Sequence, residues 1–462
     1  MKKTLAGKRW FIMLVYSLGY LGISILVQTT VKWYQYFYAP PEMNSSGLRL
    51  LIPLGLIGFT MAIARIFDGV ANPIVAYFSD SSKNKLGRRI PFILYGSVPL
   101  VITFILIWFP PVQGQSIWNF IYLTVMLSLF FTLFTIVVDP YLALIGDISR
   151  NKEERIKLTM AQGIAQVLGV MIAEAGSGVL IGISGYTFMG IVLGLFSFAT
   201  IILTPIFVRE NPVNELERQP LGIWTSIKRT LTNKNFIYYL VPYLAIWFGI
   251  NTLTISMPYI SEILLGFKPE YSGFMIAGAF IVATAFSPFL PKITLKLGKK
   301  KVMMLAQLLF GLVLFGVSTF GTLAGTPVAI AVILFAGIPL SAALIVPNAM
   351  VADIAELDAI ENGQRREGMF FGTQGLINKL MVGLSSVVTP LLFNTFGYTR
   401  ETPLGLQLCG PVSGALVLAG IFILKRYSLT EEKLEQANRE RESLLVSPER
   451  SGASAKIHRT DG

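Results

Sequence analysis

Long apolar segments alternate with short polar ones along the whole chain. A helix needs about 20 apolar residues to cross a hydrocarbon core of about 30 Å. Twelve segments have this length, and they cover residues 10–30, 50–78, 91–109, 118–145, 158–181, 187–207, 236–265, 272–290, 302–323, 328–351, 369–396 and 406–424. Lipid offers backbone groups no hydrogen-bond partners, so the pattern predicts an all-α integral membrane protein with twelve transmembrane helices.

Basic residues gather in every second connection between these segments. The N-terminal segment and the alternate loops hold 24 Lys and Arg residues, whereas the intervening loops hold 2. Cytoplasmic loops carry the excess of positive charge, so both termini are expected to face the cytoplasm. We expect a multi-pass protein of the plasma membrane, which is the inner membrane if the organism is bacterial.

The two halves of the chain resemble each other in short motifs. Lys-Leu-Gly-Arg-Arg at 85–89 follows the second segment, and Lys-Leu-Gly-Lys-Lys at 296–300 follows the eighth. Gly-Asp-Ile at 146–148 is matched by Ala-Asp-Ile at 352–354. In the same order, Gln162-Gly163 is matched by Gln374-Gly375. The repeat favours two six-helix bundles, as in transporters of the major facilitator fold, which bind substrate between the bundles near the midplane.

These observations divide the chain into four parts. We expect an N-terminal six-helix bundle at 1–208, a cytoplasmic linker at 209–235, a C-terminal six-helix bundle at 236–425 and a polar cytoplasmic tail at 426–462. The linker contains no apolar run. Within the tail, 430–445 has helix-forming composition, and 447–462 has the composition of a disordered segment.

Composition excludes several classes of function. Of the 462 residues, 53% are hydrophobic and 14% are charged, against roughly 25% charged in soluble domains. Cys409 and His458 are the single cysteine and histidine, so zinc sites and Ser–His or Cys–His nucleophile pairs are not expected. We therefore expect no enzymatic activity, no cofactor and no metal other than a coupling ion. The net charge of +12 follows the alternate loops and does not indicate a nucleic-acid partner.

The few charged residues inside the segments are the candidates for function. A charge at the centre of a span costs about 2.5 to 3.5 kcal/mol and usually faces the protein interior. Arg65, Asp68 and Asn72 in the second segment stand at i, i+3 and i+7, on one helix face. Arg65 and Asp68 either neutralise each other, or Asp68 approaches Asp139 of the fourth segment to share a cation. Two nearby carboxylates in low dielectric need a proton, a metal ion or a cationic side chain.

Two further charges and one polar stripe lie within the spans. Lys379 lies too deep in the eleventh segment to reach the membrane surface, and it is either a counter-ion or a substrate ligand. Glu174 has small neighbours and is either a protonated packing residue or part of a proton relay. Four polar residues of the first segment either line a cavity or hold helices together; they are Tyr16, Tyr20, Ser24 and Gln28.

Several of these motifs resemble one transporter family. Arg-Ile-Phe-Asp-Gly-Val-Ala-Asn-Pro at 65–73 and Gly-Arg-Arg-Ile-Pro-Phe at 87–92 are similar to the glycoside–pentoside–hexuronide:cation symporters. This family is the melibiose-permease branch of the major facilitator superfamily. Gly-Gln-Arg-Arg-Glu-Gly-Met-Phe-Phe at 363–371 agrees, and Gln374 and Lys379 follow at the spacing of the family. The resemblance covers nearly the whole transmembrane region.

The resemblance implies roles for individual positions. Asp68 matches the first cation-site aspartate of the family's second helix. Asp139 matches the fourth-helix aspartate that cation and sugar share, and Lys379 matches the eleventh-helix lysine. Asn72 stands at the family's second cation-site aspartate. With one negative charge lost there, we expect protons to serve at least as well as sodium as the coupling ion.

The sugar contacts of the family are largely missing. Ala143 stands where melibiose permease has a tryptophan that packs on the sugar ring. Ser24 falls at a sugar-binding aspartate and Gln162 at a sugar-binding arginine. Melibiose is therefore not the expected substrate.

Together the patterns predict a secondary active transporter that couples a sugar or glycoside to H⁺ or Na⁺ by alternating access. Substrate-binding or charge-pairing roles fall to Ser24, Arg65, Gln162, Gln374 and Lys379. One alternative is transport of an amphipathic lipid, because relatives of this family carry lysolipids. Another is a receptor on the same fold, because fold does not determine function.

The charge asymmetry gives a direct test of topology. A cysteine placed in the loop at 81–90 is expected to resist a membrane-impermeant thiol reagent in intact cells, whereas one in the loop at 38–48 is expected to react. Labelling of the 81–90 loop from outside would contradict the orientation.

Overall fold

The computed structural model describes residues 2–42, 44–82, 84–149, 152–210, 228–323, 325–362, 366–429, 432–436 and 439. The first half contains α1 (Lys2–Tyr38), α2 (Leu54–Ser81), α3 (Ile90–Leu106), α4 (Ile117–Ile148), α5 (Lys152–Met171), the π-helical turn η1 (Ile172–Gly176) and α6 (Ser177–Phe207). The second half contains α8 (Lys234–Tyr259), the π-helical turn η2 (Ile260–Leu264), η3 (Pro269–Tyr271), α9 (Ser272–Phe286), η4 (Ser287–Phe289), α10 (Leu290–Leu297), α11 (Lys299–Gly316), η5 (Val317–Thr319), α12 (Thr326–Phe335), α13 (Gly337–Asn362), α14 (Glu367–Phe396) and α15 (Leu404–Leu424).

The helices account for the predicted spans. Ten helical stretches of the described residues are long and apolar enough to cross a membrane. One of them, Glu153–Phe207, breaks at Ser184 and Gly185. There Gly185 has a φ of +82°, a value that favours glycine. This stretch therefore supplies the fifth and sixth spans, and the shorter apolar helix α3 completes the twelve.

The ends of several spans differ from the prediction, and the first and tenth spans differ most. The first span was expected at 10–30, but α1 continues to Tyr38 because Trp33, Tyr34 and Tyr36 are buried in the core. The tenth span was expected at 328–351, and it consists of α12 and α13, which extends to Asn362. Both differences arise because packing, rather than hydropathy alone, decides where a helix ends.

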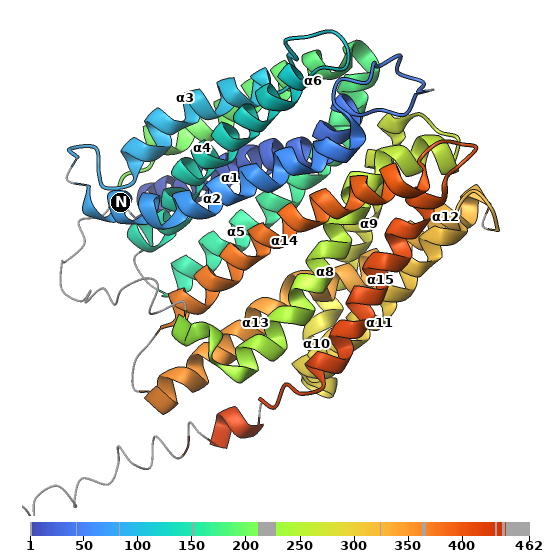
Figure 1. Cartoon of the computed structure of the whole chain (residues 1–462). Coiled ribbons are helices and arrows are strands. Elements are labelled where there is room, and N and C mark those ends of the chain that lie inside the picture. Colours follow the sequence, from blue (N-terminus) through green and yellow to red (C-terminus); the bar gives the residue numbers. More distant parts are fainter. Residues whose placement is uncertain are drawn as a thin grey trace, which may run out of the picture.

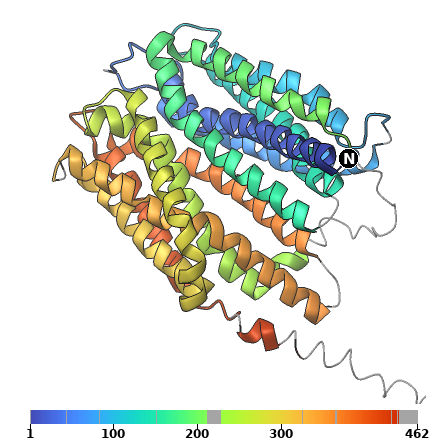
Figure 2. The ribbon, with the colours of Figure 1, turned by 180° about the vertical axis from the view of Figure 1, so that it is seen from behind.

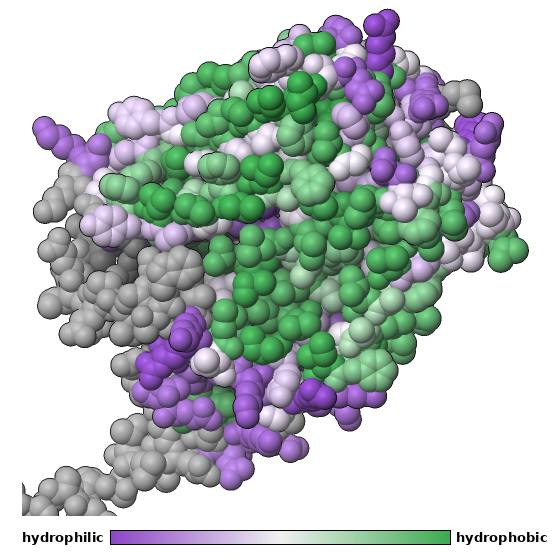
Figure 3. Space-filling view, viewed as in Figure 1, coloured by the Kyte–Doolittle hydropathy of each residue, from purple (hydrophilic) through white to green (hydrophobic). Residues whose placement is uncertain are grey.

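The helices form two groups that lie side by side. Figures 1 and 2 show α1 to α6 on one side and α8 to α15 on the other, with α2 and α14 in contact between them. Apolar side chains cover the middle of the face in Figure 3, and hydrophilic residues gather toward its ends, as lipid contact requires. Four predicted features lie wholly or partly outside the described residues. They are most of the linker, the helix expected within 430–445, the 447–462 segment and positions 363–365 of the family motif.

The repeated motifs make equivalent ion pairs in the two groups. Arg89, before α3, lies 2.9 Å from Asp147 at the end of α4. Lys299, at the start of α11, lies 2.5 Å from Asp353 of α13. In the first half, Glu210 also accepts the backbone N–H groups at the start of α3, at 2.6 to 2.8 Å. These contacts hold each group of helices together at the end predicted to be cytoplasmic.

The opposite end joins the two groups to each other. We call it the outer end, because it carries the loops with few basic residues. There Tyr259 of α8 donates to the Ala39 carbonyl at 2.8 Å, and Tyr36 of α1 donates to Glu262 of η2. Ser45 N–H also donates to Glu262, at 2.5 Å. Ser46 of the first half also donates to Glu270 of η3, at 3.4 Å. The molecule is therefore closed at the outer end.

Close backbone contact at the outer end predicts the effect of one added methyl group. A Cβ atom on Gly273 of α9 would lie 1.7 Å from the Glu174 carbonyl oxygen, so Gly273→Ala should push the two groups apart. Ala39, which is fully buried there, serves as a reporter when replaced by cysteine. We expect Gly273→Ala to increase the labelling of this cysteine by a maleimide several-fold.

Gly372→Ala is the matched control, because no heavy atom lies within 4 Å of its Cβ position. Equal labelling rates in both variants and in the parent protein would show that Gly273 does not seal the outer end.

Candidate functional site

The face of α2 that was predicted to point inward carries a buried carboxylate. Asp68 has no exposed surface, and Arg65 Nη1 lies 3.2 Å from its Oδ2. The Arg65 guanidinium also lies 3.8 Å from the centre of the Phe131 ring of α4. Aromatic faces attract such cations. The i, i+3 spacing therefore allows the Arg65–Asp68 pairing, one of the two alternatives from sequence, and α4 covers its other side.

A second cation reaches Asp68 from the other group of helices. Lys379 Nζ of α14 lies 2.8 Å from Asp68 Oδ1, 2.9 Å from Asn72 Oδ1 and 3.2 Å from Thr135 Oγ1. Thr135 in turn donates to Asp68 Oδ1 at 2.5 Å. We call Arg65, Asp68, Asn72, Thr135 and Lys379 the mid-span cluster. The ammonium group rests on three oxygens, and oxygens are the ligands that hard cations prefer.

Asp139 lies beside the mid-span cluster without joining it. It stands one turn after Thr135 on α4, is partly exposed and interacts electrostatically with Lys379 and Asp68. No hydrogen bond or ion pair links it to another residue in the described part of the chain. Ala143, one turn further along α4, is exposed. The carboxylate expected to share a cation with Asp68 is thus nearby and available, while Thr135 occupies the contact position.

The predicted ligands outside the mid-span cluster form two equivalent pairs. Gln162 of α5 lies against the hydroxyl of Tyr20 on α1, and Gln374 of α14 lies against the hydroxyl of Tyr243 on α8. The two pairs occupy corresponding helices of the two halves. Ser24 instead donates to the carbonyl of Tyr20 at 2.9 Å. Its hydroxyl is therefore already satisfied, and its Cβ atom lies next to Gly169 of α5.

The middle of α14 presents buried acceptors with no partner. Gln374 Oε1 and Asn378 Oδ1 are buried and accept no hydrogen bond from the residues that the structure describes. Buried polar atoms are nearly always hydrogen-bonded in folded proteins. These two amide oxygens, one turn apart and next to Lys379, are therefore suited to accept hydrogen bonds from a ligand.

Glu174 belongs to a separate ion pair nearer the outer end. Its carboxylate lies 2.9 Å from Lys32 Nζ and accepts a hydrogen bond from Gln28 at 2.9 Å. Both charged side chains have no exposed surface. Glu174 also sits on the π-helical turn η1, a distortion that is frequent at functional sites. The geometry adds a contact with Lys32 to the two interpretations from sequence, a protonated packing residue or part of a proton relay, and both stay predictions.

Sequence reasoning missed two residues of these clusters. Lys32 was overlooked because the first apolar segment was ended at residue 30, although it continues the four-residue spacing from Gln28. Thr135 was overlooked because a threonine in a span is not unusual. It stands four residues before Asp139, on the same helix face, and this spacing was the available signal.

Comparison with known proteins agrees with this architecture. A family model described as MFS/sugar transport protein matches residues 15–431. The chain is 24% identical over 451 residues to the sodium-dependent lysophosphatidylcholine symporter 1 of Gallus gallus, covering 86% of this chain and 84% of the relative. It is 23% identical over 442 residues to the uncharacterized symporter YnaJ of Bacillus subtilis, covering 90% of this chain and 92% of that protein.

Solved structures show the same fold at low identity. The nucleoside transporter NupG superposes with a TM-score of 0.65 at 11% identity, covering 90% of this chain and 99% of NupG. A bacterial homologue of the human lysosomal transporter Spinster, in an inward-facing and unoccupied conformation, gives a TM-score of 0.62 at 14% identity. That match covers 94% of this chain and 98% of the homologue. At this identity the likeness shows the fold alone.

The buried pair of Lys32 and Glu174 predicts a non-additive loss of stability. Lys32→Met leaves the Glu174 carboxylate buried without its cation, which should cost about 3 to 5 kcal/mol. Adding Glu174→Gln should restore most of that loss. Thermal unfolding of the purified variants measures both effects.

The exposed pair of Lys157 and Glu153, 2.7 Å apart, provides the control. Lys157→Met should change stability by about 1 kcal/mol or less, because solvent screens exposed pairs. An equally small effect of Lys32→Met would contradict a charged pair at Glu174.

Proposed function

Because the chain belongs to the MFS/sugar transport family, we propose that it is a secondary active transporter that couples a solute to a cation gradient across the plasma membrane. The two helix groups would rock about the mid-span cluster, with boundaries near residues 208 and 236. The contact of Lys379 with three oxygens carries this proposal. Lys379 belongs to one helix group and contacts the carboxylate of the other. A change in the charge of this site would therefore change how strongly the two groups hold together.

The coupling cation would compete with Lys379 for the same oxygens. A sodium ion coordinates several oxygens at once, and Asp68, Asn72 and Thr135 provide them. The displaced ammonium needs another carboxylate, because a free charge is costly inside a membrane. Asp139, partly exposed and one turn away, is the partner that we propose for it. Exchange of Lys379 between Asp68 and Asp139 would then accompany each binding event.

The solute that we propose is a sugar or glycoside. Its hydroxyl groups would donate to Gln374 Oε1 and Asn378 Oδ1, which have no partner among the described residues. Gln162 and Tyr20 would contact it from the first half, whereas Ser24 would contribute only packing. The family description, MFS/sugar transport protein, supports this substrate class.

A second candidate solute is an amphipathic lipid. It is supported by the relatives named as sodium-dependent lysophosphatidylcholine symporters, from Gallus gallus and other vertebrates. The same names support sodium as the coupling ion. Uptake of labelled sugars and of a labelled lysolipid into proteoliposomes distinguishes the two candidates.

The proposed cation site predicts loss of coupling when its carboxylates are neutralised. Asp68→Asn and Asp139→Asn should each reduce solute accumulation to the equilibrium level, because one removes the cation ligand and the other the alternative partner of Lys379. Both proteins should still fold in the membrane, since removing a carboxylate does not remove the helix, but Asp68→Asn should be the less stable of the two because it leaves Arg65 and Lys379 without their carboxylate. Accumulation in vesicles under an imposed ion gradient is the measurement, and gradient-driven uptake as strong as that of the parent protein would refute the site.

The coupling ion is identified by comparing uptake under two different gradients. Uptake is measured under a sodium gradient at constant pH and then under a pH gradient without sodium. Strict sodium dependence would overturn the expectation that protons serve at least as well. Asn72→Asp, which restores a negative charge beside Asp68, should increase stimulation by sodium. Glu153→Gln, at an exposed carboxylate, is the control for a charge change outside the site.

A further inference from the structure

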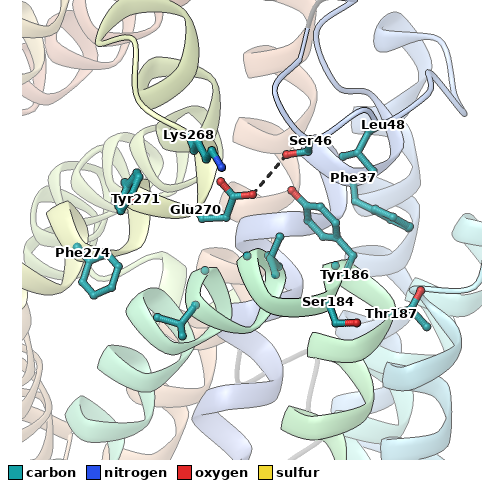
Figure 4. Close-up of a pocket in the computed structure, with 15 residues that line it drawn as sticks. Phe37, Ser46, Leu48, Ser184, Tyr186, Thr187, Lys268, Glu270, Tyr271 and Phe274 are labelled. Atoms are coloured by element: carbon teal, nitrogen blue, oxygen red, sulfur yellow. Dashed lines mark hydrogen bonds between the residues drawn. The ribbon is translucent and has the colours of Figure 1, made fainter.

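The outer end contains a pocket that shares no residue with the mid-span cluster. It has a volume of about 720 Å³, within the range of roughly 300 to 1,000 Å³ that is usual for ligand sites. Its walls come from both halves of the molecule, as Figure 4 shows. Phe37 of α1 and Tyr186 of α6 lie on one side, and Lys268, Glu270 and Phe274 lie on the other.

Two buried polar atoms in this pocket have no partner. Tyr186 is 4% exposed, and its ring packs against Trp33, Phe37 and Trp108. Its hydroxyl makes no hydrogen bond with any described residue. Glu270 Oε2 is likewise buried without a partner. Figure 4 shows the Tyr186 hydroxyl directed toward the Glu270 carboxylate. Such groups are normally satisfied in folded proteins, so this geometry indicates a ligand with polar hydrogens.

The charges around the pocket indicate which kind of ligand fits. Glu270 Oε1 accepts a long hydrogen bond of 3.4 Å from Ser46, which leaves most of the carboxylate charge available. Phe37 and Tyr186 make the opposite wall largely apolar, and such a wall accepts a weakly hydrated ammonium group more readily than a strongly hydrated ion. Lys268 is exposed and pairs with no acidic residue of the described ranges. The interior of the pocket can therefore bind an ammonium group through Glu270, and Lys268 can bind an anionic group.

We propose that the outer pocket binds a small zwitterion, with its ammonium group at Glu270 and Tyr186 and its anionic group at Lys268. This site is additional to the transport site of the proposed function. Because its walls belong to both helix groups, it is complete only while the outer end is closed. A ligand that binds one arrangement shifts the equilibrium toward it. Occupation from outside therefore holds the outer end closed and inhibits transport.

A close backbone contact between α6 and η3 completes this pocket. A Cβ atom on Gly178, at the start of α6, would lie 2.2 Å from the Glu270 carbonyl oxygen. The backbone of η3 thus rests directly on α6, and Glu270 reaches the pocket only because glycine stands there. Separation of the two helix groups would remove Glu270 from Tyr186 and dismantle the site.

Binding is tested with phosphocholine as the zwitterion, choline as the ammonium alone and inorganic phosphate as the anion alone. In a maltoside detergent without phospholipid, phosphocholine should raise the Tm most, choline less and phosphate not at all, because a ligand stabilises the state that it binds. Glu270→Gln should weaken phosphocholine binding by about tenfold. Lys268→Gln, at an exposed side chain that folding does not require, should weaken phosphocholine but not choline.

Glu42→Gln is the matched control, since Glu42 is an exposed carboxylate at the same end. Equal phosphocholine binding by the parent, Glu270→Gln and Lys268→Gln proteins would overturn the proposal, and so would an equal response to phosphate. Binding should survive Asp139→Asn, which is also predicted to lose coupled uptake but breaks no hydrogen bond or ion pair of the described residues. Loss of binding there would assign the ligand to the transport site instead, which separates failure of this proposal from failure of the proposed function.

Inhibition is tested in right-side-out vesicles. Phosphocholine added outside should slow uptake by the parent protein several-fold and should leave Glu270→Gln unaffected. Nanodiscs then distinguish the source of the ligand. If discs of phosphatidylcholine block binding of free phosphocholine and discs of phosphatidylglycerol do not, the ligand is a lipid headgroup. Binding in both discs identifies a free zwitterion, and absence of inhibition in the parent protein would refute a regulatory role.

Discussion

The contact between the Lys379 ammonium and the Asp68 carboxylate is the interaction on which the arrangement of the two helix groups depends. Asp68 is fully buried and touches two cations, Arg65 from its own helix and Lys379 from α14. In low dielectric a carboxylate cannot lose its partner without a large cost in free energy. Separation of α2 from α14 therefore requires another cation at Asp68 and another anion at Lys379. Electrostatic compensation thereby links the occupancy of the site to the position of the helices.

The contacts at the two ends of the molecule differ in kind. At the end predicted to be cytoplasmic, ion pairs such as Arg89–Asp147 and Lys299–Asp353 each lie within one helix group. At the outer end, the groups meet through tyrosine hydroxyls and through glycines that permit backbone contact. Charged pairs that stay inside a group preserve its shape, whereas close packing between groups is strong only when the surfaces fit. This division is what movement of two rigid bodies requires.

Much of the fold could be predicted from sequence, because lipid forces each long apolar segment into a helix. The Arg65–Asp68 pair was also predictable, since i, i+3 spacing on one helix is enough to bring the side chains together. The Lys379 contacts were not, because they depend on how α14 packs against α2. Lys32 was not predicted, for a different reason. A window of hydropathy penalises a lysine even where an intramembrane carboxylate pairs with it, as Glu174 does here.

The equivalent Tyr20–Gln162 and Tyr243–Gln374 pairs show where symmetry has been retained and where it has been lost. Both halves keep a tyrosine and a glutamine on corresponding helices. In contrast, the one carboxylate of the mid-span cluster, Asp68, comes from the first half, and the lysine comes from the second. A symmetric pair of polar contacts suits a solute held between the halves, since both can grip it alike. An asymmetric distribution of charge suits a coupling ion. The first half then provides the carboxylate that binds the ion, and the second half provides the lysine that replaces it. Under the proposed function, the repeat would supply the solute site, and the departure from the repeat would supply the coupling.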